Sequence, residues 1–184
     1  MCWKNLTLKV RKLILSEEKV ILKEISGYVR MGSLWGLMGP SGAGKSSLLR
    51  ALYGHKRDLI TKDSEIYFNK NIKMKTCFIS QDVRLHIIDG LTVKESLFYA
   101  TKLKNSSSIG KSIDYNSIVD KLMNDFAIVD IKDVKIGKCS SGQQKKCVLA
   151  MELCTEELPN IMFVDEPTSG LDSYSAEMVR SLIY

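Results

Sequence analysis

Eight consecutive residues, Gly39 to Ser46, have the types and the spacing that hold nucleotide phosphates. They read Gly-Pro-Ser-Gly-Ala-Gly-Lys-Ser and satisfy the P-loop pattern G-x-x-x-x-G-K-[ST]. The glycines allow the backbone to curl so that several N–H groups point at phosphate oxygens. Lys45 supplies a positive charge for the β- and γ-phosphates, and the Ser46 hydroxyl is a ligand for Mg²⁺. The residues predicted to bind ATP are Gly39, Pro40, Ser41, Gly42, Ala43, Gly44, Lys45, Ser46 and Ser47.

A pair of acidic residues, Asp165 and Glu166, stands directly after four apolar residues at 161–164. A carboxylate at the end of a buried strand near a P-loop is placed to hold Mg²⁺ through water, which is the Walker B role. Glu166 is then placed to act as a general base on the attacking water. An apolar run before two acids also describes a strand that ends in a solvated turn. The P-loop upstream favours the Walker B interpretation.

Alternating strand and helix patterns are needed to position these residues. Short apolar runs predict strands at 6–10, 20–22, 34–38, 66–68, 77–79 and 161–164. Helical patterns follow at 93–104, 118–126 and 142–154, and another helix begins near Lys45. The strand at 34–38 and the helix at Lys45 flank the P-loop, which disfavours an accidental glycine-rich turn. Strands that alternate with helices predict an α/β fold.

Three further segments distinguish one family of P-loop proteins from the others. Residues 139–143 read Cys-Ser-Ser-Gly-Gln and open a helix shortly before the Walker B strand, where Ser140 is placed to cap that helix and to reach a phosphate. Gln81 follows the strand at 77–79, and residues 169–172 read Ser-Gly-Leu-Asp. A plain Ser-Ser-Gly helix start is the alternative for 139–143. Together the five segments resemble an ABC cassette, in the ABC order of Walker A, Q-loop, signature, Walker B and D-loop.

Longer stretches resemble the G (white/pigment-precursor) subfamily of ABC transporters. The similar stretches read LKEISGYVRMGSLWGLMGPSGAGKSSLL, SQDVRLHIIDGLTVKESLFYAT and VLAMELCTEELPNIMFVDEPTSGLDSYSA. The resemblance implies a P-loop NTPase core with an antiparallel β subdomain and a helical signature subdomain. It assigns residues 1–184 to one ATP-binding domain of a half-transporter, associated with the cytoplasmic face of a membrane. ATP hydrolysis would then drive the export of a lipid, sterol, pigment precursor or xenobiotic.

The same resemblance implies roles for residues of the Q-loop and Walker motifs. Gln81 senses Mg²⁺ and the attacking water, and it links to the transmembrane partner. Gln81 and Glu166 are therefore the expected catalytic residues. Ser46, Gln81 and Asp165 are the expected contacts of Mg²⁺.

The implied partners are a second cassette, identical or different, and the transmembrane domain of the same full-length chain. Two cassettes of this family close head-to-tail on two ATP molecules. The resemblance implies that Ser140 and Gly142 serve the ATP of the opposite cassette. It places Asp172 in the D-loop that crosses the interface.

The chain departs from the family pattern in four places, one of which is Val10, where many ABC proteins have an aromatic residue that stacks on adenine. Ser141 stands where the signature normally has its first glycine, and a side chain there is expected to crowd the approach to the partner's γ-phosphate. Gln144 replaces the basic residue common in the subfamily, although Lys145 and Lys146 follow it. The sequence ends at Tyr184, before the strand with the family's switch histidine, so the resemblance implies a C-terminally truncated domain.

Composition and charge are those of an ordinary globular protein. The 184 residues are 45% hydrophobic and 26% charged, which suffices for one domain with its own core. The net charge of +6 fits a solvated basic surface, or attraction to an anionic membrane face or nucleic acid. Because no stretch combines Lys, Arg and aromatic residues, no nucleic-acid partner is predicted.

Cysteine, histidine and hydropathy patterns disfavour other classes of site. The five cysteines form no C-x-x-C pair, which is typical of a reducing compartment rather than a disulfide framework. His55 and His86 lack metal-ligand spacing. No segment approaches the roughly 18 to 20 apolar residues of a membrane span, so none is predicted in this chain.

Three interpretations of the function, each from a different class of protein, are consistent with these observations. The first is the ATP-hydrolysing motor domain of a half-transporter, with ATP and Mg²⁺ as cofactors. The second is a soluble ABC ATPase of the DNA-repair or translation type, which the absence of sustained heptads and of a second cassette disfavours. The third is a short regulatory or inactive ATP-binding module, which Ser141 and the missing switch histidine favour. The five ordered motifs favour the first.

Overall fold

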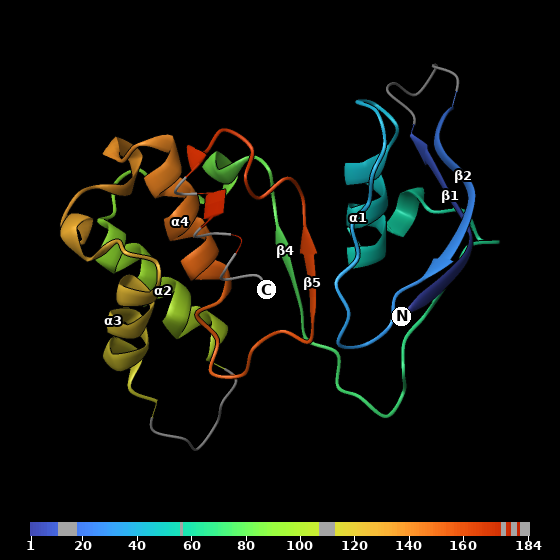
Figure 1. Cartoon of the computed structure of the whole chain (residues 1–184). Coiled ribbons are helices and arrows are strands. Elements are labelled where there is room, and N and C mark those ends of the chain that lie inside the picture. Colours follow the sequence, from blue (N-terminus) through green and yellow to red (C-terminus); the bar gives the residue numbers. More distant parts are fainter. Residues whose placement is uncertain (11–17, 56, 107–112, 174–175, 178–179, 181–184) are drawn as a thin grey trace. The chain divides into compact units, whose positions relative to one another are not determined.

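Two units make up the fold, Met1–Thr76 and Cys77–Tyr184. The computed structural model describes residues 1–10, 18–55, 57–106, 113–173, 176, 177 and 180. Figure 1 labels the helices and strands of both units, which are described separately below. Strands and helices alternate along the chain, which confirms the predicted α/β class.

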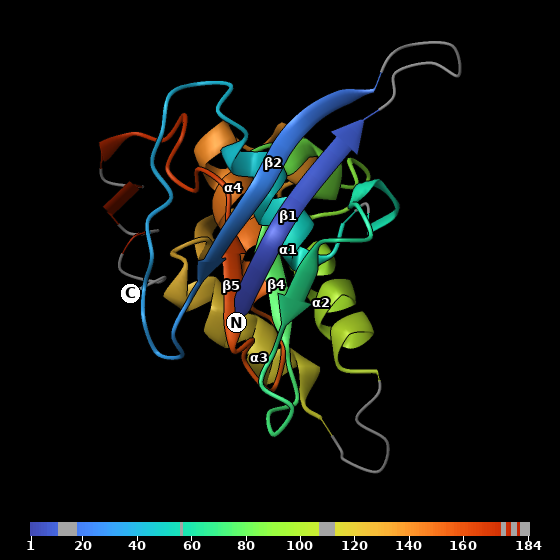
Figure 2. The same ribbon diagram turned by 90° about the vertical axis from the view of Figure 1, so that its right-hand side faces the viewer.

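Unit 1 contains a three-stranded antiparallel sheet in the order β2-β1-β3, which Figure 2 shows face-on. The strands are β1 (Cys2–Val10), β2 (Lys19–Tyr28) and β3 (Glu65–Tyr67). In the register of the sheet, Cys2 of β1 lies opposite Tyr28 on one side and Tyr67 on the other. Leu6 and Leu8 alternate along β1 and are buried, as a half-buried strand requires. This sheet is the antiparallel β subdomain that the family resemblance implied.

Helix α1 (Lys45–Tyr53) of unit 1 lies between two left-handed glycines. Gly44 precedes it with a φ of 91°, and Gly54 follows it with a φ of 101°. The N–H of Gly54 donates to the carbonyls of Arg50 and Ala51, which satisfies the last turn of the helix.

The strand predicted at 34–38 is not formed, and that prediction was wrong. Residues 33–40 have no regular secondary structure, and Met38 is 92% exposed. An apolar run becomes a strand only where a neighbouring strand pairs with its N–H and C=O groups. In the part of unit 1 that the structure describes, β1 pairs with β2 and with β3, and none of the three strands pairs with 34–38.

Unit 2 contains two hydrogen-bonded strands and three longer helices. The strands are β4 (Thr76–Ile79) and β5 (Ile161–Val164), and the helices are α2 (Val93–Lys104), α3 (Tyr115–Asp125) and α4 (Ser141–Glu152). Figures 1 and 2 both show the helices together on one side of the strand pair. Their core holds the fully buried Leu97, Val119, Phe126 and Leu149. Each such side chain contributes about 1.5–3 kcal/mol to the free energy of folding.

Side-chain caps decide where the helices of unit 2 begin. Thr92 and Glu95 form a capping box at the start of α2, where the sequence predicted a helix over 93–104. Helix α3 begins three residues before the predicted position 118, because Asp114 accepts hydrogen bonds from the N–H groups of Asn116 and Ser117, both at 3.1 Å. The predicted helix at 142–154 is α4, which ends two residues earlier than expected.

Candidate functional site

The P-loop of unit 1 is an exposed backbone turn that leads into α1. Gly42 and Gly44 have φ angles of 80° and 91°, in the left-handed region that glycine tolerates best. The N–H of Ala43 donates to the carbonyl of Pro40 at 3.2 Å, which closes the turn. The nine predicted ATP-binding residues, 39–47, thus comprise this exposed turn and the first three residues of α1.

Lys45 lies at the start of α1 and folds back over the loop. Its ammonium donates to the carbonyls of Gly39 and Pro40, at 2.9 Å and 3.0 Å. Ser46 is half-buried beside it in the first turn of the helix. The helix N-terminus and the ammonium together place positive charge beside the loop, an arrangement of the kind that binds phosphate.

The predicted Q-loop residue Gln81 and the predicted Walker B residues Asp165 and Glu166 lie together where β4 and β5 end. This part of unit 2 is called the carboxylate end below. The N–H of Asp165 donates to the carbonyl of Ile79 at 2.9 Å, which fixes the end of β5 against the end of β4. Asp165 is 4% exposed, whereas Glu166 is exposed. The Gln81 side-chain amide donates to the Glu166 carboxylate at 2.8 Å. The structure therefore brings Gln81 to the consecutive residues Asp165 and Glu166, although Glu166 lies 85 positions further along the sequence.

Glu166 has a backbone conformation that is rare for a residue with a side chain. Its φ is 48°, in the left-handed region, and the following residue is proline. Such a conformation costs of order 1–3 kcal/mol and persists only where the surroundings enforce it. The carbonyl of Glu166 accepts from the N–H of Ser169 at 3.2 Å, which closes a tight turn after β5. The predicted D-loop follows, with Gly170 left-handed and Asp172 exposed.

Lys145 of α4 is a contact of this turn that the sequence did not predict. It is 3% exposed, and its ammonium donates to the carbonyls of Glu166 at 2.9 Å and Ser169 at 3.2 Å. Burial lowers the pKa of Lys145, while the carboxylates of Glu166 and Asp165 act in the opposite direction. In the sequence, Lys145 is only a lysine within an apolar helical segment, and this pattern does not indicate which residues its ammonium contacts.

The predicted signature segment begins α4. Ser140 caps the helix, as predicted: its hydroxyl accepts from the N–H of Gln143 at 3.3 Å, and the Gln143 side chain accepts from the N–H of Ser140 at 2.9 Å. Ser141 and Gly142 form the first turn of the helix, where a serine needs no glycine-like conformation. The Gln144 amide donates to the carbonyls of Ile136 and Gly137, which fixes the turn before the signature.

The buried thiols of unit 2 are unsuited to nucleophilic chemistry. Burial raises the pKa of Cys147 to about 12 and that of Cys77 to about 11. Burial also raises the pKa of Cys139 and Cys154. Because the thiolate is the nucleophile, thiols that stay protonated at neutral pH are inert.

The predicted Mg²⁺ contacts offer donors that suit the ion. Ser46, Gln81 and Asp165 provide hydroxyl, amide and carboxylate oxygens, which are the hard ligands that Mg²⁺ prefers. Within the described ranges, no cluster of three or more His, Cys, Asp or Glu side chains could hold a metal ion. A Mg²⁺ site with few protein ligands is completed by water and by the phosphates of a nucleotide.

Comparison with solved structures gives the class of the fold. The chain superposes on a dimeric structure of the ATP-binding cassette MJ0796, captured in a post-hydrolysis state bound to ADP and Pi, with a TM-score of 0.74 and 22% identity. That match covers 99% of this chain and 80% of the other. The fold is therefore that of an ATP-binding cassette.

Sequence comparison then gives the family. The family model described as ABC transporter matches residues 22–169, so the chain belongs to the ABC transporter family. It is 35% identical to ABC transporter G family member 22 of Arabidopsis thaliana, over 95% of this chain and 24% of that protein. It is 32% identical to the multidrug resistance protein CDR2 of Candida albicans, over 98% of this chain and 12% of that protein. The chain thus spans a quarter or less of the length of these relatives. None of its helices that the structure describes is long and apolar enough to cross a membrane.

Proposed function

We propose that the chain binds and hydrolyses MgATP as the nucleotide-binding domain of a membrane exporter. The hydrogen bond of 2.8 Å between Gln81 and Glu166, beside the buried Asp165, carries the proposal. It brings an amide and a carboxylate within reach of one water molecule. A P-loop that matches its pattern at every position supplies the phosphate site in the same chain.

Nucleotide binding is the role of the P-loop in this proposal. Lys45 leaves the carbonyls of Gly39 and Pro40 and donates to the β- and γ-phosphate oxygens instead. The N–H groups of the loop and of the first turn of α1 surround the same oxygens, with Ser47 on the α-phosphate side. Ser46, Gln81 and Asp165 would hold Mg²⁺, which neutralises charge on the phosphates when bound.

Hydrolysis is the role of the carboxylate end. The oxygen of a water molecule forms a bond to the γ-phosphorus while the bond to the bridging β–γ oxygen breaks, which leaves ADP and phosphate. Glu166 takes the proton of that water as the general base, and Gln81 orients the same water. The carboxylate must exchange its hydrogen bond from Gln81 for one from the water, and both groups are exposed enough to do so.

Pairing with a second cassette completes the proposed site. Ser140 and Gly142 lie at the start of α4, where the hydroxyl and the helix N-terminus would meet the γ-phosphate on the other cassette. Asp172 would cross the interface between the two. A transmembrane domain in the same full-length protein, at the cytoplasmic face, would convert closure into export. The name of the Candida albicans relative, a multidrug resistance protein, favours a xenobiotic as cargo, and the resemblance to the G subfamily adds a lipid, sterol or pigment precursor as candidates.

The nucleotide specificity of thermal stabilisation tests the binding step. We expect ATP and ADP with Mg²⁺ to raise the melting temperature of the chain, because both carry the β-phosphate that Lys45 contacts. AMP lacks that phosphate and should give no shift. Equal shifts with AMP and ATP would contradict a P-loop site.

The size of the native protein tests the transporter assignment. An antibody against this segment is used on membrane and soluble fractions of the source cells. We expect a membrane-bound band several times larger than the 20.7 kDa of this chain. A single soluble band near 20.7 kDa would contradict transport by this protein.

A further inference from the structure

Lys145 donates to the turn that follows β5. Its ammonium joins the carbonyl of Glu166 to the carbonyl of Ser169, three residues later, from the buried face of α4. The N–H of Ser169 donates to the same Glu166 carbonyl. The turn is thus closed by its own hydrogen bond from Ser169 to Glu166, and Lys145 adds two further hydrogen bonds from α4.

The turn that Lys145 contacts includes Glu166, whose backbone conformation is strained. Glu166 is held at a φ of 48° between Asp165, which is fixed to β4, and Pro167, which cannot donate a hydrogen bond. Without the ammonium, the Glu166 carbonyl would keep only the hydrogen bond from the N–H of Ser169, which belongs to the same turn, and the turn would lose its link to α4. The Glu166 carboxylate would then move away from Gln81.

Burying the Lys145 ammonium against the turn has a large cost in desolvation free energy. Removing a charge from water costs several kcal/mol unless hydrogen bonds and opposite charges compensate it. Here two carbonyls accept from the ammonium, and the carboxylates of Asp165 and Glu166 lie close enough to favour its charged form. The charged form of Lys145 is therefore favoured only while Asp165 and Glu166 remain in their present positions.

We propose that Lys145 is a positioning residue that holds Glu166 in the conformation needed for hydrolysis and couples it to the signature helix. The inference rests on the proposed function, because it assigns Lys145 a part in the same reaction. Ser140 caps the first turn of α4, and Lys145 stands on the second turn. A phosphate that engages the start of α4 would thus be connected to the general base through one rigid turn of helix and two hydrogen bonds.

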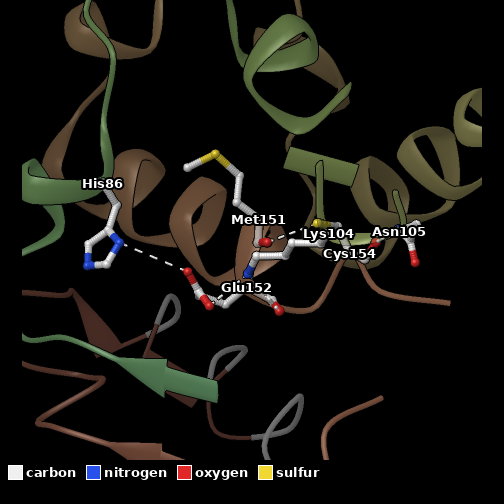
Figure 3. Close-up of polar contacts among 6 residues, drawn as sticks. All are labelled: His86, Lys104, Asn105, Met151, Glu152 and Cys154. Carbon is white, nitrogen blue, oxygen red and sulfur yellow. Dashed lines mark hydrogen bonds and ion pairs between the residues drawn. The ribbon is translucent and has the colours of Figure 1, made fainter. Parts of the chain in front are cut away.

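The test compares three variants of the whole chain. Lys145→Met keeps an unbranched side chain that lacks only the position of the nitrogen, and so removes every donor, whereas Lys145→Gln keeps a shorter, neutral donor. Lys104→Met is the matched control, because Lys104 also donates to a backbone carbonyl of unit 2. Lys104 is the last residue of α2, and its ammonium donates to Glu152 at the end of α4, to the carbonyl at 3.3 Å and to the carboxylate at 2.8 Å. Figure 3 shows Lys104 beside Glu152.

Two readouts separate positioning from general stability. The first is hydrogen exchange of the backbone amides of residue 166 and residues 168–171. The second is phosphate release in a single turnover, with the chain in excess over radiolabelled ATP, together with the dissociation constant for ATP. We expect Lys145→Met to speed exchange and to slow release by about tenfold or more, the effect of losing a charge-assisted hydrogen bond, at unchanged ATP affinity. Lys145→Gln should be intermediate, and Lys104→Met should resemble the wild type in both readouts.

Different results would overturn the inference about Lys145 and the proposed function. Equal exchange and equal phosphate release in Lys145→Met and Lys104→Met would overturn the inference alone. A slower release that arises only from weaker ATP binding would also overturn it. A wild-type chain that binds no ATP, or that releases no phosphate above the Glu166→Gln background, would overturn the proposed function and, with it, the catalytic part of the inference.

Discussion

The P-loop of unit 1 and the carboxylate end of unit 2 are built in opposite ways. The ammonium of Lys45 bonds to carbonyls five and six residues away, and the loop is closed by neighbouring residues. The carboxylate end depends on contacts across 21, 24 and 85 positions, from Lys145 to Glu166 and Ser169 and from Gln81 to Glu166. One region is therefore shaped by local backbone conformation, and the other by the packing of separate elements.

This difference predicts different vulnerabilities. A local loop retains its shape as long as its glycines and the helix after it remain. A site assembled from β4, β5 and α4 loses its geometry when any of these elements shifts. Changes in the P-loop should thus abolish nucleotide binding, whereas changes at the carboxylate end should leave binding intact and reduce turnover.

The largest effect should come from Glu166→Gln. The substitution keeps the shape of the side chain and removes its basicity, so turnover should fall by about 10²- to 10⁴-fold, the usual contribution of a general base. ATP affinity should stay near that of the wild type, because the P-loop is unchanged. Phosphate release and nucleotide binding are measured on the same preparation.

Glu24→Gln is the matched control for that experiment. Glu24 is exposed on β2 and has the same φ of 48° as Glu166, but it belongs to no predicted motif. Its replacement should leave turnover unchanged. If Glu166→Gln hydrolyses ATP as fast as this control, Glu166 is not the base.

The second effect, in order of size, is the loss of ATP binding in Lys45→Ala. The ammonium would make two charge-assisted hydrogen bonds to phosphate, each worth about 1.5–3 kcal/mol, so affinity should fall by about 100-fold or more. Calorimetry or the ATP-induced rise in melting temperature measures the loss. Lys70→Ala removes an exposed lysine of unit 1 and should bind normally. Retained binding in Lys45→Ala would show that the nucleotide sits elsewhere.

The two regions also differ in how far the sequence could predict them. The P-loop follows from a pattern over eight positions, and each residue in it has a local physical reason. The elements that carry the second region were predicted closely: β5 covers 161–164 as expected, and β4 and α4 each begin one residue before the predicted positions 77 and 142. Strong apolar runs and capping residues explain this success.

The failures concern interactions that reach beyond a short window. The run at 34–38 has the composition of a buried strand, but strand formation depends on a pairing partner that composition does not specify. The contact of Lys145 with the Glu166 turn depends on how α4 packs against the end of β5, and a lysine carries no such information in its type. The start of α3 was missed because Asp114 was not recognised as its cap.

A smaller effect is expected for Gly44→Ala, which tests the local character of the P-loop. A Cβ at this position would lie 3.0 Å from a methyl carbon of Leu22, at a φ of 91°. The strain should lower the free energy of unfolding by about 1–2 kcal/mol and weaken ATP binding as well. Gly36→Ala is the control, since a Cβ there meets no atom within 4 Å and no left-handed φ is required. Equal stability of the two variants would argue against a shape set by Gly44.

The smallest effect should come from substitutions of Ser140, and it separates the two roles of that hydroxyl. Ser140→Ala removes the cap of α4 and should cost about 1 kcal/mol of folding stability, whereas Ser140→Gly should cost only a few tenths. Denaturant unfolding measures both values. Because Ser140→Gly keeps the helix but lacks the hydroxyl, it isolates the contact with the opposite cassette's phosphate. If the hydroxyl makes that contact, both variants should lose ATP turnover equally despite their different stabilities. If turnover instead follows stability, Ser140 acts only as a cap, and the carboxylate end would depend on α4 through its packing alone.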